Sequence, residues 1–375
     1  MWVAECSNAN ERGRLVLTQG IFATIGTVAA AWLEFGLLFT TSAANWRFPI
    51  AFQGVYILIV TSLVLFLPES PRWLITKDQP EQASSVLSAL QGLPISSPTI
   101  TQEIAQMRAS YREEQHQQST SALFNTSPER PFHRATLAIL VAIFGQMCGL
   151  NIVTFYSDTI LETQLHYSAS ETRIFSGCMQ IWQMLSACLS VLVIDRFGRR
   201  KLLLCGAVGM CITQAALAGL MSDLSTSPAA AKAAIFLYFC AMFFFPIGLF
   251  LIPFMYAAEI APLAIRHQVT AIAACANWLF NFLVAEVTPH AMENIGYRYY
   301  IVYACINAFA VVVVGFFCPE TRGRSLEEMD EVFVRSRGLL DPVRLEKGMP
   351  RRAEGEGIGG GDVEKELDVR LEGGS

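Results

Sequence analysis

The sequence predicts an all-α integral membrane protein. Of its 375 residues, 53% are hydrophobic and only 16% are charged, and the mean hydropathy is +0.40, far from the balance of a soluble chain. The apolar residues also come in uninterrupted blocks of about 20, the length that a helix needs to cross a bilayer. No block alternates polar and apolar residues as barrel strands do. Because hydrocarbon offers backbone groups no hydrogen-bond partner, these blocks must be helices.

The first block is a retained span rather than a signal peptide. It is too long for a signal sequence, it follows a charged run at Glu11–Arg14, and no small-residue cleavage site comes close behind it. It is also the only block that contains a charged residue, Glu34, near one end. We expect eight spanning helices, at 15–39, 49–67, 135–155, 174–194, 202–221, 233–258, 268–285 and 299–318.

The segments between and after the spans differ in composition. Residues 68–134 carry Pro, Ser and Gln with amphipathic stretches at 80–91 and 100–114, which predicts a cytosolic linker with short surface helices. Residues 336–375 are rich in Gly, Glu and Arg, which predicts a disordered cytosolic tail. The linker therefore separates two spans in 1–67 from a six-helix half at 135–335.

Basic residues predict the orientation. With a cytosolic N-terminus, 23 of the 27 Lys and Arg residues lie on the cytosolic side, and 13 still do when the residues from Arg322 onward are left out. Only Arg47, Arg173, Lys232 and Arg298 lie outside. Because cytosolic loops retain Lys and Arg, we expect both termini in the cytosol, and the plasma membrane as the location.

Several short strings are too specific to come from composition. PESPRWL (68–74), DRFGRR (195–200) and PETRGRSLEEMD (319–330) each follow a span. Together they resemble the sugar porter branch of the major facilitator superfamily, in its fungal-type members. Further strings that carry the resemblance are ECSNANERGRL (5–15), QMCGLNIVTFY (146–156), AAEIAPLAIR (257–266) and NWLFNFLV (277–284).

This resemblance implies the major facilitator fold, which has twelve helices in two six-helix halves. The eight spans then correspond to helices 5 to 12, so the fold is incomplete and residues 1–67 are a remnant of the N-terminal half. PESPR and PETRGR lie six helices apart, as two parallel repeats of one half would leave them. The expectation is that the chain as written does not transport by the family mechanism, and is unstable, oligomerises or is completed by an upstream exon.

By resemblance, charged residues at the cytosolic helix ends form a gate that closes when the transporter faces outward. Such pairs are stable in one arrangement of the halves and break in the other. Acid and base recur seven residues apart, as Glu5 with Arg12 and Glu259 with Arg266, which favours a gate over simple positive-inside anchors. The expected gate residues are Glu5, Arg12, Asp195, Arg199, Arg200, Glu259, Arg266, Glu320 and Arg324.

Polar side chains inside the spans are candidates for the substrate site. Asn and Gln both donate and accept hydrogen bonds without charge, which suits sugar hydroxyls, and aromatic rings pack on the apolar faces of a sugar. Singly, each amide is as readily explained as a contact between helices. By resemblance, the substrate-binding residues are Gln146, Asn151, Phe155, Tyr156, Gln183, Phe254, Asn277, Trp278 and Asn281. Gln180, Gln214 and Asn307 lack that support and are interpreted as contacts between helices.

Some positions depart from the family pattern. Gly20 and Gly145 stand where Gln is common, and Phe254 stands where Trp is common, so hydrogen-bonding groups are lost. High affinity for an ordinary hexose is therefore not expected, and a different polyol, a disaccharide and lost transport remain the alternatives. Pro246 and Pro253 interrupt the sixth span, either to let a gate bend or because Pro is simply frequent in membrane helices.

The leading function is secondary active or facilitative transport of a sugar or polyol by alternating access, with a proton as cosubstrate in coupled members. The alternative is a non-transporting member, either a nutrient sensor or an inactive truncated product. An enzyme is not expected, because H-E-x-x-H, G-x-S-x-G and paired carboxylates inside the spans are absent. Ten cysteines without a C-x-x-C pair predict no metal or cofactor, and the net charge of -5 predicts no nucleic-acid partner.

Overall fold

The structure of the protein, a computed structural model, describes residues 12–40, 42–117, 130–163, 167–222, 228–262, 265–324, 326–336 and 338–348. Within these ranges eight helices are long and apolar enough to cross a membrane, and there is no strand. Each helix falls on one of the eight predicted blocks, which confirms the all-α membrane fold. The spans are Thr18–Leu37, Ala44–Val64, Pro131–Thr154, Ala169–Phe197, Arg199–Ser222, Lys232–Ile260, Arg266–Asn294 and Arg298–Phe317.

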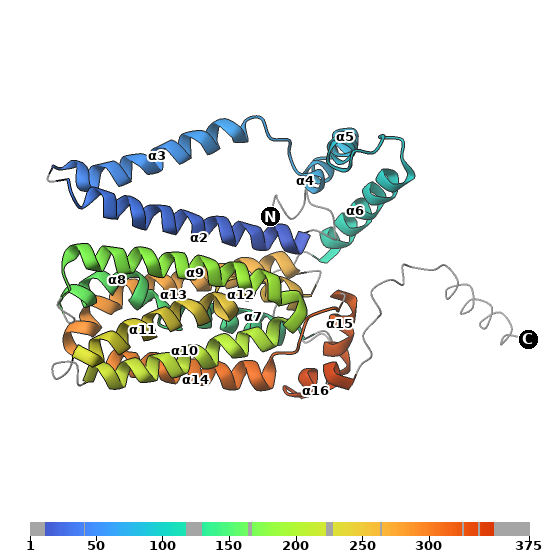
Figure 1. Ribbon diagram of the computed structural model, residues 1–375. Coiled ribbons are helices and arrows are strands. Elements are labelled where there is room, and N and C mark those ends of the chain that lie inside the picture. Colours follow the sequence, from blue (N-terminus) through green and yellow to red (C-terminus); the bar gives the residue numbers. More distant parts are fainter. Residues whose placement is uncertain are drawn as a thin grey trace, which may run out of the picture.

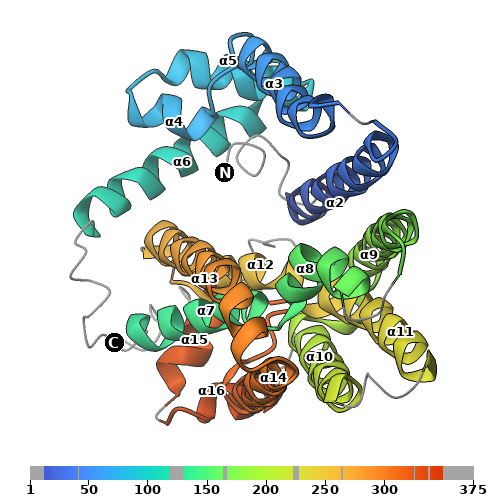
Figure 2. The ribbon, with the colours of Figure 1, turned by 90° about the vertical axis from the view of Figure 1, so that its left-hand side faces the viewer.

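Six of these spans pack into one bundle, which Figures 1 and 2 show from the side and end-on. Two spans are broken: one into α7 and α8, the other into α11, the π-helix η3 and α12. The bundle shares one continuous hydrophobic core. Its elements are α7 (Pro131–Gln146), α8 (Leu150–Thr163), α9 (Ala169–Phe197), α10 (Arg199–Ser222), α11 (Pro228–Phe245), η3 (Pro246–Phe250), α12 (Ile252–Ile260), α13 (Arg266–Asn294) and α14 (Arg298–Phe317).

Glycine allows a close backbone approach between α10 and η3. A Cβ added at Gly206 would lie 2.9 Å from the Gly248 Cα, and one added at Gly248 would collide with the Leu202 carbonyl oxygen. Small residues of this kind let membrane helices gain dispersion contacts, which replace the hydrophobic drive that lipid removes. The Pro246–Gly248 interruption of the sixth span is therefore a packing contact as well as a change of helix type.

The two N-terminal spans differ in their packing. Helix α2 (Arg12–Leu37) lies along α9, where a Cβ at Gly177 would come within 3.1 Å of the Trp32 ring. Gly20 also faces the Leu251 side chain, which fills the space that a larger residue would need. Helix α3 (Ala44–Val64) turns back beside α2, and none of its residues is buried.

The linker forms three helices, of which two were predicted. These are α4 (Pro71–Thr76), α5 (Pro80–Gln91) and α6 (Pro98–Gln117), and they share a small core built around Leu74, Leu87 and Ile100. The sequence did not predict α4, which is a single short turn capped by the Ser70 hydroxyl at 3.1 Å from the Trp73 N–H.

Of the segment expected to be disordered, 336–375, residues 341–348 form a helix, and another helix directly precedes the segment. Two amphipathic helices, α15 (Leu326–Arg335) and α16 (Asp341–Gly348), lie against one end of the bundle. Phe333 and Val343 are buried, and this burial orders a segment whose overall composition is polar. Residues 349–375 lie outside the described ranges.

Candidate functional site

Four side-chain amides meet where α7, α8 and α13 come together. Gln146 ends α7, Asn151 begins α8, and Asn277 and Asn281 lie one turn apart on α13. The Gln146 Nε2 donates to the Asn277 Oδ1 at 3.0 Å, and the Gln146 Oε1 accepts from the Asn151 Nδ2 at 3.0 Å and the Asn281 Nδ2 at 2.9 Å. The structure thus brings four of the predicted binding residues into one cluster, the amide cluster.

The break between α7 and α8 positions this cluster. Gly149 adopts φ 89°, and a Cβ there would lie 2.6 Å from the Gln214 Nε2. The freed Cys148 carbonyl accepts from the Gln214 Nε2 at 3.4 Å and from the Asn307 Nδ2 at 2.9 Å. Gln214 and Asn307 are therefore contacts between helices, as interpreted from the sequence, and they hold the joint that sets Gln146 beside Asn151.

The other predicted binding residues are not hydrogen-bonded into the cluster. Trp278 is 68% exposed and Phe254 is 45% exposed. Phe155 and Tyr156 belong to α8, but their side chains lie outside the described residues.

Gln183 lies on α9 and is buried. Its Oε1 and that of Gln180, three residues earlier on the same helix, are buried without a hydrogen-bond partner among the described residues. The sequence alone assigned Gln180 no role beyond a contact between helices. Its spacing of three residues from Gln183 places the two amides on the same face of α9.

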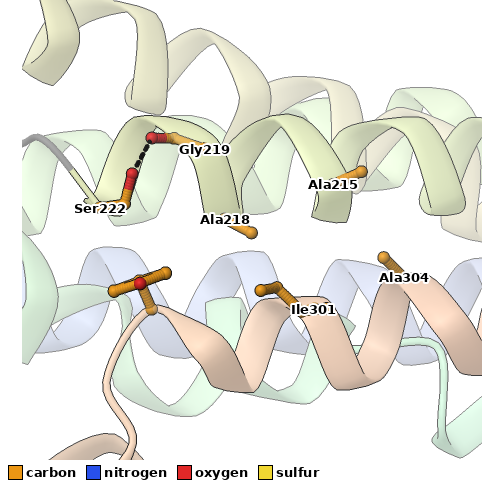
Figure 3. A pocket seen from close by; sticks show the side chains of 7 residues that line it. Ala215, Ala218, Gly219, Ser222, Ile301 and Ala304 are labelled. Carbon is orange, nitrogen blue, oxygen red and sulfur yellow. Dashed lines mark hydrogen bonds between the residues drawn. The ribbon is translucent and has the colours of Figure 1, made fainter.

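Two cavities of the described structure are lined by residues outside the amide cluster. One of about 300 Å³, shown in Figure 3, lies between α10 and α14 and is lined mostly by small or apolar residues such as Ala215, Ala218 and Ile301. Its Ser222 hydroxyl already donates to the Gly219 carbonyl at 2.7 Å. Another of about 500 Å³ is lined by Trp182, Cys240 and four Phe residues. The first offers the hydroxyls of Ser222 and Tyr297 as its side-chain polar groups, and neither cavity is lined by an amide or a charged side chain.

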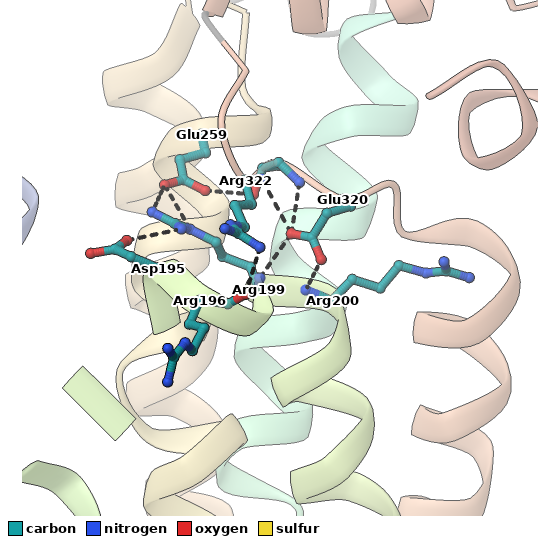
Figure 4. A network of polar contacts seen from close by, with 8 residues as sticks. Asp195, Arg196, Arg199, Arg200, Glu259, Glu320 and Arg322 are labelled. Atoms are coloured by element: carbon teal, nitrogen blue, oxygen red, sulfur yellow. Dashed lines mark hydrogen bonds and ion pairs between the residues drawn. The ribbon is translucent and has the colours of Figure 1, made fainter. Parts of the chain in front are cut away.

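Charged side chains meet at one end of the bundle, between α9, α10 and α12 (Figure 4). The Arg199 guanidinium lies 3.1 Å from the Glu259 Oε1 and 3.3 Å from the Asp195 Oδ1. The second Glu259 oxygen accepts from the Thr321 hydroxyl at 2.6 Å. Three of the predicted gate residues thus form one network, which we call the Arg199 network.

Glu320 lies beside the Arg199 network and contacts backbone N–H groups. Its carboxylate accepts from the backbone N–H groups of Arg199 at 2.8 Å and Arg200 at 3.1 Å, the first two residues of α10. It also accepts from the N–H groups of Thr321 and Arg322. Since the first N–H groups of a helix lack internal partners, Glu320 caps α10 and complements its dipole.

Gly198 makes this cap possible. It adopts φ 92°, and a Cβ there would come within 2.5 Å of the Glu320 Oε2.

The side chains of the remaining gate candidates contact other partners. The Arg200 guanidinium donates to the Val314 and Gly315 carbonyls, and Arg266 donates to the Ala261 carbonyl at 3.5 Å. Arg324 pairs with Glu346 of α16 at 3.6 Å, and both side chains are nearly fully buried. Glu5 and the Arg12 side chain lie outside the described residues. The predicted gate is therefore only partly assembled in one place.

Comparisons with known proteins agree with this architecture. The sequence matches the family described as Sugar (and other) transporter over residues 1–333. Sugar transporter STL1 of Saccharomyces cerevisiae is 32% identical over 354 residues, which cover 94% of this chain and 62% of that protein. High glucose sensor RGT2 of the same yeast is 30% identical over 364 residues, which cover 94% of this chain and 47% of that protein. The chain thus spans less than two thirds of the length of these relatives.

Solved structures share the fold. The proton:xylose symporter XylE bound to 6-bromo-6-deoxy-D-glucose superimposes with a TM-score of 0.73 at 24% identity, covering 88% of this chain and 69% of that one. The inward-open xylose transporter XylE from E. coli gives a TM-score of 0.68 at 25% identity, covering 88% of this chain and 68% of that one. This likeness confirms the major facilitator fold.

Proposed function

We propose a function for this chain from one premise: the chain belongs to the sugar transporter family of the major facilitator superfamily. A protein of this family that holds both six-helix halves moves a sugar or a related polyol across a membrane by alternating access, in which the halves rock around a site between them. This chain supplies the six-helix half and two further spans of such a transporter. The names of its relatives, a sugar transporter and a proton:xylose symporter, support this substrate class and a proton as a possible cosubstrate.

The amide cluster is the observation that carries the proposal. Gln146 holds Asn151, Asn277 and Asn281 at 2.9–3.0 Å, so four uncharged groups are fixed in position before a ligand arrives. The Asn151 and Asn281 oxygens take no part in the cluster, and each amide keeps further donors or acceptors for a sugar hydroxyl. Preorganisation of this kind lowers the entropic cost of ordering these side chains when a ligand binds.

Aromatic and amide side chains extend the proposed site. Trp278 follows Asn277 on α13 and is 68% exposed, so its ring is available to cover the apolar face of a sugar. The buried oxygens of Gln180 and Gln183 have no hydrogen-bond partner among the described residues, which supports a role as acceptors from substrate hydroxyls. Phe155, Tyr156 and Phe254 complete the proposed lining.

The Arg199 network supports a gate on the cytosolic side. It lies at the end of the bundle where α4 to α6, α15 and α16 gather and where α2 begins (Figure 1), so the linker helices, the start of α2 and α16 share one side. The basic residues assign this side to the cytosol. In the proposed cycle, the network rearranges as the halves rock, and the plasma membrane is the proposed location.

A second function is favoured by one relative, the high glucose sensor. A non-transporting receptor would bind sugar at the same amides without moving it across the membrane. Binding and uptake measured on the same preparation separate the two functions.

The test combines calorimetric binding with uptake into liposomes, on the 375-residue chain and a panel of labelled hexoses, pentoses and polyols. Asn277→Ala or Asn281→Ala removes one amide and should weaken binding by about 1–3 kcal/mol. The matched control is Gln53→Ala, because Gln53 is an exposed amide on α3. Saturable, stereoselective uptake that falls in both Asn variants supports transport. Binding without uptake supports the non-transporting alternative, a sensor or an inactive truncated product, and unchanged binding in both variants contradicts the site.

A further inference from the structure

One ion pair joins α2 to the six-helix bundle. The Arg173 Nη1 donates to the Glu34 Oε2 at 3.1 Å, linking the last turns of α2 to the first turns of α9. Glu34 is the charged residue that set the first apolar block apart from the other seven. A charge within a span is costly, so its presence indicates a role beyond anchoring.

This pair lies at the end of α9 opposite the Arg199 network. Arg173 and Asp195 are 22 residues apart on one helix. At about 1.5 Å per residue they are separated by about 33 Å, close to the thickness of the hydrocarbon core. The two charged clusters therefore belong to opposite membrane interfaces.

The helices that the pair joins are in direct contact. Gly177, one turn after Arg173, lies against the Trp32 ring, where an added Cβ would be 3.1 Å from the indole. Trp32 in turn packs edge-on against Phe35, with ring centroids 5.7 Å apart. Any rocking that separates α2 from α9 at this end must break both the contact of Trp32 with Gly177 and the ion pair.

We propose that Glu34 and Arg173 form a clasp that holds these ends of α2 and α9 together and so favours the conformation closed on the side opposite the Arg199 network. The proposal rests on alternating access as the function. The side chains are 54% and 33% exposed, so the clasp is weak enough to open and re-form. Exposed pairs of this strength shift a two-state population by roughly two- to fivefold.

The test is a distance measurement by electron paramagnetic resonance in lipid nanodiscs. Spin labels on genetically encoded ketone residues leave the native cysteines in place. One pair of labels replaces Thr40 and Ala169, beside the clasp, and the other replaces Gln19 and Phe197, at the opposite ends of the same helices.

Glu34→Gln and Arg173→Gln should each increase the long-distance population of the Thr40–Ala169 pair by roughly two- to fivefold. The Gln19–Phe197 distances should shift in the opposite sense, as they do when rigid halves rock. The charge exchange Glu34→Arg with Arg173→Glu should restore the original distribution. The control is Glu162→Gln, an exposed carboxylate of α8 that lies near the same end.

Unchanged Thr40–Ala169 distances in both single variants would overturn the clasp. A change confined to that pair would also overturn it, because local fraying of a helix end does not alter which side is open. Failure of the charge exchange to restore the distribution has the same meaning. Absence of sugar binding and uptake would contradict the proposed function while leaving these distances measurable, so the two failures are distinguishable.

Discussion

Helices α3 and α9 have the same hydropathy and opposite packing. Both spans average 1.6, yet 39% of the α9 window is buried and none of the α3 window is. Hydropathy therefore measures how well a helix suits lipid and says little about which helices it contacts. The difference follows from the neighbours of each helix: α9 lies against α2, α11 and η3, whereas the main neighbour of α3 is α2.

The six-helix bundle buries small and polar residues between its helices, and α3 buries none of its own. Gly206 and Gly248 let two backbones meet, and the Arg134 side chain is buried at the start of α7. On α3, Gly54 has no neighbouring atom within 4 Å, and Arg47 is exposed. Matched substitutions in the two regions turn this comparison into experiments.

The largest effect is expected at Arg134. Its guanidinium lies 2.6 Å from the Asp330 Oδ1, its Nε donates to the Ile260 carbonyl at 2.5 Å, and it stacks on Phe333 at 4.8 Å. Arg134→Met removes the cation that joins α7, α12 and α15 and leaves a half-buried carboxylate behind. We expect a loss of about 3 kcal/mol, measured as a lower unfolding midpoint in detergent.

Arg47→Met is the control. Arg47 is exposed, and its guanidinium lies over the exposed Trp46 ring, 5.1 Å from the ring centroid. Its midpoint should stay within the error of the measurement. Equal losses in the two variants would show that burial of the arginine does not set the difference between the regions.

The next effect is expected at the close contact of α10 with η3. Gly248→Ala places a methyl group against the Leu202 carbonyl and the Gly206 Cα, so one helix must move away. Overpacking of this kind costs about 2 kcal/mol. Gly54→Ala in α3 adds the same methyl group in open space and should be neutral or slightly stabilising, since Ala favours helix. Thermal unfolding of both variants decides whether the contact is as tight as the structure has it.

The eight spans were predictable because each is an uninterrupted apolar block. The ends of the spans were less predictable. The apolar block of α13 stops at residue 285, before Glu286, but the helix continues to Asn294 because Glu286 and Glu293 are exposed and do not break it. Helix α16 was missed because its segment is polar overall, and only the fold buries Val343 and pairs Glu346 with Arg324.

The amide cluster was predictable because its residues belong to recognisable strings on three helices. The contacts of Glu320 and Arg324 were not predictable. They depend on which helices the chain meets after it leaves α14. A carboxylate near an arginine in the sequence suggests a gate pair, but the Glu320 oxygens accept hydrogen bonds from backbone N–H groups of α10. Side-chain to backbone contacts of this kind leave no spacing in the sequence to detect.

The smallest effect is expected at Glu320, and it compares the two repeats directly. PETRGR places Glu320 on the N-terminus of α10, whereas PESPR places Glu69 on the surface. Glu320→Gln keeps the size of the side chain but removes its charge. The new amide NH₂ group is itself a donor, so it cannot accept a hydrogen bond from the N–H groups of α10. Because hydrogen bonds to a charged acceptor are the stronger ones, we expect a loss of about 1.5 kcal/mol.

Glu69→Gln should change the free energy of unfolding by less than about 0.5 kcal/mol. Hydrogen exchange at the amides of Arg199 and Arg200 gives a local measurement: exchange should accelerate in Glu320→Gln and stay unchanged in Glu69→Gln. If the α10 amides keep their protection in Glu320→Gln, the carboxylate is not the cap, and Glu320 returns to the gate pairing that its motif suggested.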